Sequence, residues 1–87
     1  MEQLREIANL ESELNCLRRE KEVLEQNYNR RKQELLQLSM AAITGERHTE
    51  LIREMVILNS GFRRESDKLS NQIYYTTNAL NARRRNQ

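Results

Sequence analysis

Apolar residues recur at alternating steps of three and four residues through the first half of the chain. This spacing predicts an α-helix that buries a narrow stripe against another helix, as in a coiled coil. Because a helix cannot bury such a stripe against itself, we expect the chain to pair with a helical partner. The residues expected to mediate oligomerisation are Ile7, Leu10, Leu14, Leu17, Leu24, Tyr28, Leu35 and Leu38.

Two charged residues interrupt this stripe. Lys21 occupies a core position of the type called a in the seven-residue repeat, and Arg31 occupies a position of type d. A charged core residue costs stability, although a long side chain can carry its charge out of the seam. We interpret both as ordinary imperfections of a natural coiled coil.

The charges that flank the stripe do not favour a parallel pair of identical chains. In such a pair Glu6 would face Glu11 and Glu20 would face Glu25, which are repulsive contacts. A third flanking contact is attractive, and each contact contributes only a few tenths of a kcal/mol. The pattern therefore leaves room for an antiparallel arrangement or for a different partner chain.

The apolar stripe changes register near Gly45. Glycine in a helix interior costs about 1 kcal/mol relative to alanine, and glycine is favoured just past a helix end. After the break a second stripe, offset by the equivalent of a three-residue insertion, runs through Ile52, Met55, Asn59, Phe62, Ser66, Leu69, Ile73, Thr76 and Leu80.

Two all-α architectures fit this break. The first is a long coiled-coil helix, continuous or kinked near Gly45, which would form a rod of roughly 130 Å. The second is an antiparallel helical hairpin that turns at Thr44 and Gly45 and assembles into a four-helix bundle. We favour the long helix, because the candidate turn has one glycine, no proline and no cluster of Asn, Asp or Ser.

The chain divides into four segments by pattern. Residues 1–43 carry the leucine stripe, 44–50 form a register break or hinge, 51–69 have a wider apolar surface, and 70–87 are polar with a basic tail. Apolar residues near the start of the third segment cover most of the helix circumference, which is more than one neighbour can bury. The residues expected to contact a partner or a bundle are Leu51, Ile52, Met55, Val56, Leu58, Phe62, Leu69 and Ile73.

Composition supports long amphipathic helices rather than a globular enzyme. Hydrophobic residues make up 37% of the chain and charged residues 32%, and 15 basic residues nearly balance 13 acidic ones. The balanced charge and the periodic apolar positions argue against disorder. His48 and Cys16 are the only residues of their types, too few for a Cys/His metal cluster or a catalytic triad. We expect no enzymatic activity and no cofactor.

No apolar run reaches the roughly 18 residues that a membrane span requires, so we expect no transmembrane segment. The first residues lack the basic-then-apolar order of a signal peptide. A cytoplasmic or nuclear location is the default expectation. We also expect the chain to be a segment of a longer protein, with a short complete protein as the alternative.

The sequence favours a non-enzymatic oligomerisation or scaffold module that forms a dimer or tetramer, docks a partner such as another coiled-coil protein, and fits a cytoskeletal setting. One alternative is binding of nucleic acid or another polyanion, microtubules included, through Arg83, Arg84 and Arg85. It is less favoured because no aromatic residue lies among these arginines to stack on bases. A second alternative is a subunit that donates a helix to a hetero-oligomer.

Overall fold

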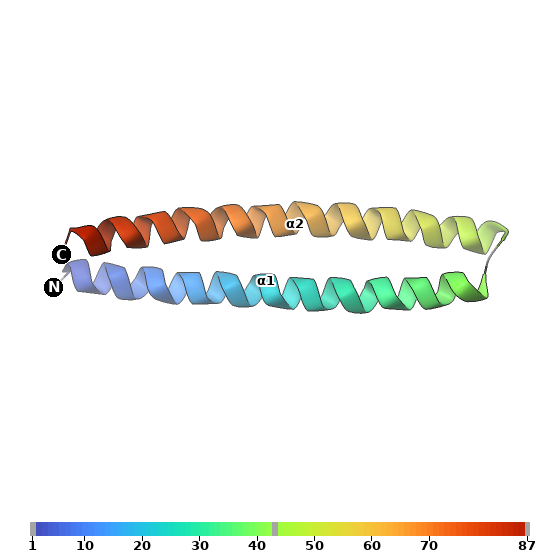
Figure 1. The fold of residues 1–87 in the computed structure, drawn as a ribbon, viewed down its shortest axis with the longest axis horizontal. Helices are drawn as coiled ribbons and strands as arrows, with labels where there is room; N and C mark the ends of the chain where they lie inside the picture. The colour runs from blue at the N-terminus through green and yellow to red at the C-terminus, as the bar shows by residue number, and fades with distance from the viewer. Residues whose placement is uncertain (1, 43, 87) are drawn as a thin grey trace.

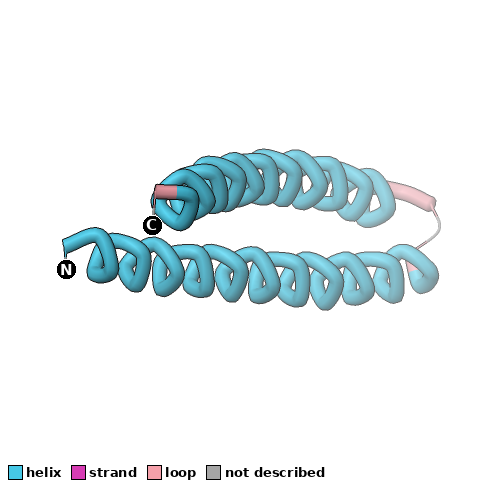
Figure 2. The backbone as a smooth tube through the Cα atoms, turned by 60° about the vertical axis from the view of Figure 1, so that its left-hand side comes forward, coloured by secondary structure: helices cyan, strands magenta, loops and turns pink. Residues whose placement is uncertain are grey.

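Two long α-helices lie side by side and run in opposite directions (Figure 1). The computed structural model describes residues 2–42 and 44–86. Residues 1, 43 and 87, which are end residues of the expected segments 1–43 and 70–87, lie outside the described part. Helix α1 spans Glu2–Ala41 and helix α2 spans Glu46–Arg85, with 40 residues in each. The all-α prediction is confirmed, and a second view shows the same antiparallel pair (Figure 2).

The chain forms the hairpin, and the favoured long continuous helix is wrong. The molecule measures 64 × 15 × 14 Å, which matches about 60 Å for one helix of this length and is half the length expected for the rod. Gly45 decides the outcome, since its φ of 93° and ψ of −170° lie in a region open essentially only to glycine. This conformation lies directly before the first residue of α2, within the connection between the two helices.

Contacts of side chains from the first turn of α2 hold the connection between the helices. The His48 Nδ1 atom lies 3.0 Å from the carbonyl oxygen of Ala42. Because a carbonyl oxygen only accepts, this ring nitrogen carries the hydrogen. The Thr49 hydroxyl and backbone N–H both donate to the Gly45 carbonyl oxygen. His48 thus satisfies a carbonyl at the C-terminus of α1 that lacks a partner within the helix.

The core is a narrow seam between the two helices. Among the described residues, the buried apolar side chains are Ile7, Leu14, Leu17 and Leu35 from α1 and Leu51, Leu69 and Leu80 from α2. Leu35 and Leu51 are the most buried, at 1% and 2% exposure. At the end that holds the termini, Leu10 and Ile73 pack against Ile7, Leu14 and Leu80.

The seam of α2 differs from the expected stripe in its first part. Leu51 is buried and Leu58 half-buried, whereas the expected Ile52 is 51% exposed and Asn59 is also exposed. From Phe62 onward the buried and half-buried positions follow the expected stripe. Two consecutive four-residue steps around Phe62 shift the contact line across α2, as a stutter does in a coiled coil.

An aromatic pair fills the seam where this shift occurs. The rings of Tyr28 and Phe62 stack with their centroids 4.1 Å apart and an interplanar angle of 14°. The Tyr28 hydroxyl donates to Asn59 Oδ1 at 2.5 Å, and the Lys32 Nζ atom lies 5.7 Å from the centre of the Tyr28 ring. Asn59 thus contributes to the pairing of the helices through its polar side chain, which an apolar pattern does not reveal.

Candidate assembly surfaces

The leucine stripe of the first half is largely covered by the second half of the same chain. Of the residues expected to mediate oligomerisation, four are buried: Ile7, Leu14, Leu17 and Leu35. Three more, Leu10, Leu24 and Tyr28, are half-buried, and Leu38 is 41% exposed. Helix α2 is therefore the partner that the stripe requires. A contact with another molecule has to use the outer surfaces of the hairpin.

The residues expected to contact a partner separate into two groups. Six lie along the seam, with Leu51 and Leu69 buried and Met55, Leu58, Phe62 and Ile73 half-buried. The other two, Ile52 and Val56, point outward with 51% and 59% of their surface exposed. One side of the wide apolar surface of this segment thus packs against α1, and another side is exposed to solvent.

The hairpin exposes more surface than a compact protein of its mass. Its accessible surface is 7028 Å², against about 5400 Å² expected for a folded monomer of 10.4 kDa. Its radius of gyration is 19.4 Å, against about 12 Å for a compact chain of this length. A two-helix rod leaves most of each helix circumference open to solvent.

Large exposed apolar side chains concentrate near the turn. Six of them lie within about three turns of helix from one another along the molecule, on both helices: Leu36, Leu38, Met40, Ile52, Val56 and Ile57. Outside this region the exposed large apolar residues are Leu4, Val23, Tyr74 and Tyr75. Such a concentration is typical of a surface that contacts another protein.

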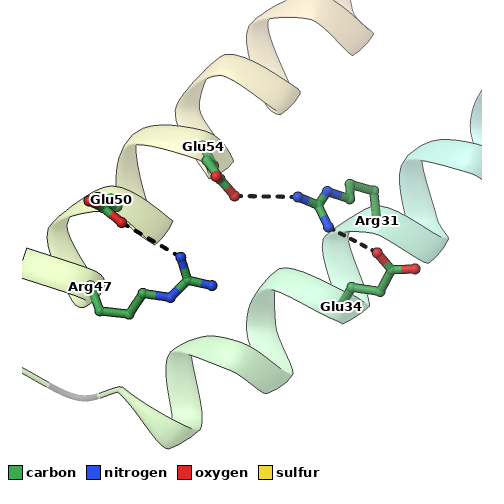
Figure 3. Close-up of polar contacts among 5 residues, drawn as sticks. All are labelled: Arg31, Glu34, Arg47, Glu50 and Glu54. Atoms are coloured by element: carbon green, nitrogen blue, oxygen red, sulfur yellow. Dashed lines mark hydrogen bonds and ion pairs between the residues drawn. The ribbon is translucent and has the colours of Figure 1, made fainter.

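One broad side of the hairpin near the turn is charged, and we call it the ion-paired face (Figure 3). Arg31 bridges Glu34 at 3.0 Å and Glu54 of the opposite helix at 3.4 Å. Arg47 pairs with Glu50 at 3.6 Å. All of these side chains are about half exposed, so each pair contributes at most about 1 kcal/mol. Helical spacing places Leu38 and Ile57 on this side as well.

The other broad side near the turn carries Lys32 as its charged residue among exposed apolar side chains, and we call it the apolar face. Leu36 follows Glu34 by two positions, and Ile52 precedes Glu54 by two. Two positions correspond to about 200° around a helix, so Leu36 and Ile52 lie on the side of the seam opposite to these two glutamates. Residues spaced three and four apart continue this face on each helix. It comprises Lys32, Leu36, Ser39 and Met40 of α1 and Thr49, Ile52, Val56 and Asn59 of α2.

Sequence reasoning missed Leu36 and Met40 as candidate contact residues. Both lie outside the leucine stripe, and Met40 is 79% exposed. The signal that identifies them is their alignment with Ile52 and Val56 on one side of the hairpin. That alignment exists only once the two helices are known to be antiparallel.

At the open end, where the two termini lie, the basic tail is joined to the start of α1 (Figure 1). Arg83 pairs with Glu6 at 3.3 Å, and Arg84 pairs with Glu11 at 2.6 Å. The Gln3 side-chain amide also donates to the carbonyl oxygen of Arg83. Two of the three arginines considered for polyanion binding thus have acidic partners within the chain.

The remaining candidate residues lie apart from these surfaces. Cys16 is an exposed free thiol, and His48 contacts the backbone at the turn. Within residues 2–42 and 44–86, no three His, Cys, Asp or Glu side chains are grouped so as to hold a metal ion. Neither described helix has an apolar stretch long enough to cross a membrane.

The comparisons with known proteins add no relative, since no family model, curated protein or solved structure matches the chain.

Proposed function

We propose that this hairpin is a non-enzymatic assembly module that self-associates through its outer surface. The assembled hairpins can then act as a scaffold that binds other helical proteins. The observation that carries the proposal is the cluster of exposed apolar side chains near the turn. Removing apolar surface from water contributes about 25 cal/mol for each Å², so a cluster of this kind favours association.

The size of the core supports the same proposal. Only seven apolar side chains are buried among the described residues, all in a single seam between two helices. A chain of this size with one narrow core is marginally stable by itself. Association buries further apolar surface, and the folded state then becomes more stable as the protein concentration rises.

The roughly 1600 Å² of surface in excess of a compact monomer is enough for an interface. A standard stable interface takes about 800 Å² from each partner. The hairpin can therefore supply such an area and still leave one broad side open to a further protein.

Light scattering coupled to size-exclusion chromatography tests the proposal. We expect a mass at least twice the 10.4 kDa of the chain, together with a thermal midpoint that rises with protein concentration. Circular dichroism in the same samples confirms that the chain is helical. A folded chain that has the monomer mass at every concentration, with a constant midpoint, contradicts self-association.

A further inference from the structure

The middle of the seam is the least buried part of the hairpin. Residues 18–34 of α1 and 52–68 of α2 lie at the same height along the rod, because Tyr28 bonds to Asn59 between them, and neither stretch contains a buried residue. Buried leucines flank this region toward both ends of the rod. A segment with few buried apolar contacts opens locally at a lower cost than the rest of a fold. We therefore expect the helices to separate most readily here.

This stretch contains a polar pair within the seam. Lys21 of α1 and Ser66 of α2 lie on the lines of contact of their helices, and both are half-buried. Lys21 precedes Tyr28 by seven residues, and Ser66 follows Asn59 by seven. Both therefore lie about 10.5 Å along the rod from the hydrogen bond that joins Tyr28 to Asn59. A half-buried cation of α1 thus lies opposite a half-buried hydroxyl of α2.

Two arginines precede this serine. Arg63 and Arg64 stand three and two positions before Ser66, and no other serine or threonine of the chain has arginine at both of these positions. Both arginines are exposed, and within residues 2–42 and 44–86 neither forms an ion pair. An acidic peptide-binding groove can recognise such a pair, because carboxylates bind planar guanidinium groups through two hydrogen bonds. Protein kinases select their substrates through charge patterns of this kind.

We propose that Ser66 is a phosphorylation site for an arginine-directed serine kinase, and that Lys21 receives the phosphate across the seam. The Ser66 Oγ atom attacks the γ-phosphorus of ATP, a new O–P bond forms as the bond to ADP breaks, and the hydroxyl proton passes to the catalytic aspartate of the kinase. Residues 63–66 have to leave the helix to enter the kinase groove, and the weakly buried middle of the seam allows this opening. The modification goes beyond self-association and does not depend on it.

The surroundings of Ser66 determine what the phosphate does once it is attached. A phosphoserine carries a charge of about −1.5 to −2 at pH 7 and is costly in an apolar interface unless cations pair with it. Lys21 faces Ser66 across the seam, and Arg63 lies one turn away on the same side of α2. The nearest acidic residues are Glu20 and Glu25 of α1 and Glu65 and Asp67 of α2. Each of them is next in sequence to a seam residue, so each is rotated by about 100° away from the seam.

Mass spectrometry of the intact chain, after treatment with an arginine-directed serine kinase, ATP and Mg²⁺, tests the site. We expect one phosphate per chain, on Ser66, and none in Ser66→Ala. Arg63→Ala combined with Arg64→Ala should lower the initial rate at least about tenfold, since the groove then loses its charged contacts. Ser70 is a matched internal control, because it is also half-buried but follows Asp67 and Lys68 instead of two arginines.

Three results of this experiment overturn the assignment. The first is no incorporation into the parent chain. The second is a phosphate on Ser70 or on another residue in place of Ser66. The third is a rate that is unchanged when both arginines are replaced, with circular dichroism showing that the variant is helical.

Urea denaturation at one protein concentration tests the role of Lys21. The effect of the phosphate is compared in the parent chain and in Lys21→Met, which keeps a long side chain but removes its charge. We expect phosphorylation to raise the unfolding equilibrium constant about tenfold more in Lys21→Met than in the parent, because one charge-assisted contact is lost. Lys32→Met, about 16 Å farther along α1, should respond to the phosphate as the parent does. An equal effect of the phosphate in Lys21→Met and in the parent overturns the pairing with Lys21.

Discussion

Replacing Gly45 by alanine tests the account of the turn. Gly45 has a φ of 93° and a ψ of −170°, and a non-glycine residue held in such a region costs about 1–3 kcal/mol. A Cβ atom at this position would meet no other atom within 4 Å, so the cost is backbone strain without a steric contribution. We expect Gly45→Ala to lower the free energy of unfolding by about 2 kcal/mol.

The second glycine of the chain is a control with the opposite sign. Gly61 lies inside α2, and a Cβ atom there would also meet nothing within 4 Å. Alanine is favoured over glycine in a helix interior by about 1 kcal/mol, so Gly61→Ala should raise the free energy of unfolding by up to that amount. The two variants introduce the same methyl group and differ only in the backbone conformation that receives it.

Urea denaturation followed by circular dichroism, at one protein concentration for all variants, measures both changes. A distance measurement between labels at residues 3 and 80 shows whether each variant remains a hairpin. The strained turn should hold in Gly45→Ala, because burial of Leu35 and Leu51 on either side of it outweighs the strain. If Gly45→Ala is neutral or stabilising while the labels stay close, the assigned strain at the turn is refuted.

Three further substitutions probe the seam and the open end. Leu35→Ala removes the most buried side chain of α1 and should lower the free energy of unfolding by about 3 kcal/mol in a denaturant titration; a loss under about 1 kcal/mol would contradict its burial at 1% exposure. Tyr28→Phe keeps the stacked ring but removes the hydrogen bond to Asn59. We expect it to lower the free energy of unfolding by about 1 kcal/mol in thermal melting, and we expect no further decrease when Asn59 is also replaced by alanine. Glu11→Gln weakens the ion pair with Arg84, whose side chains are about half exposed. It should cost less than about 1 kcal/mol in low salt and nothing in high salt, and a cost that persists in high salt would show that the pair is not solvent-screened.

The sequence predicts the helices and the position of the break, but not the direction that the chain takes there. The three-and-four spacing of the leucines is a local property of one helix, so it can be read directly. The connection contains Gly45 with a positive φ, and a lone glycine is compatible in sequence with both a kinked helix and a turn. Only the fit of α2 on α1 selects between them.

The seam of α2 illustrates a second limit. Ile52 and Asn59 have the same spacing as Leu51 and Leu58, and which pair faces α1 depends on the rotation of α2 about its axis. The contact line shifts at Phe62, where its ring stacks on that of Tyr28. Periodicity identifies the candidates, whereas the stacking between helices chooses among them.

The assembly surfaces are less accessible to sequence reasoning than the seam. The apolar face combines residues from two helices that are separated by the turn, and neither helix by itself shows a long apolar stripe on that side. Likewise, the pairing of Arg83 and Arg84 with acidic residues of α1 follows from the return of the chain to its starting point. Such surfaces depend on the antiparallel register, which no local pattern contains.

The meeting of both ends of the chain beside Gln3 and Arg83 gives the hairpin the geometry of a side arm. Any polypeptide fused to either end would depart from the same place, so the pair of helices could be spliced into an exposed loop of a host protein without forcing its two edges apart. The turn would then stand at the far end of an arm 64 Å long. A peptide epitope grafted at that turn would be displayed well beyond the surface of the host.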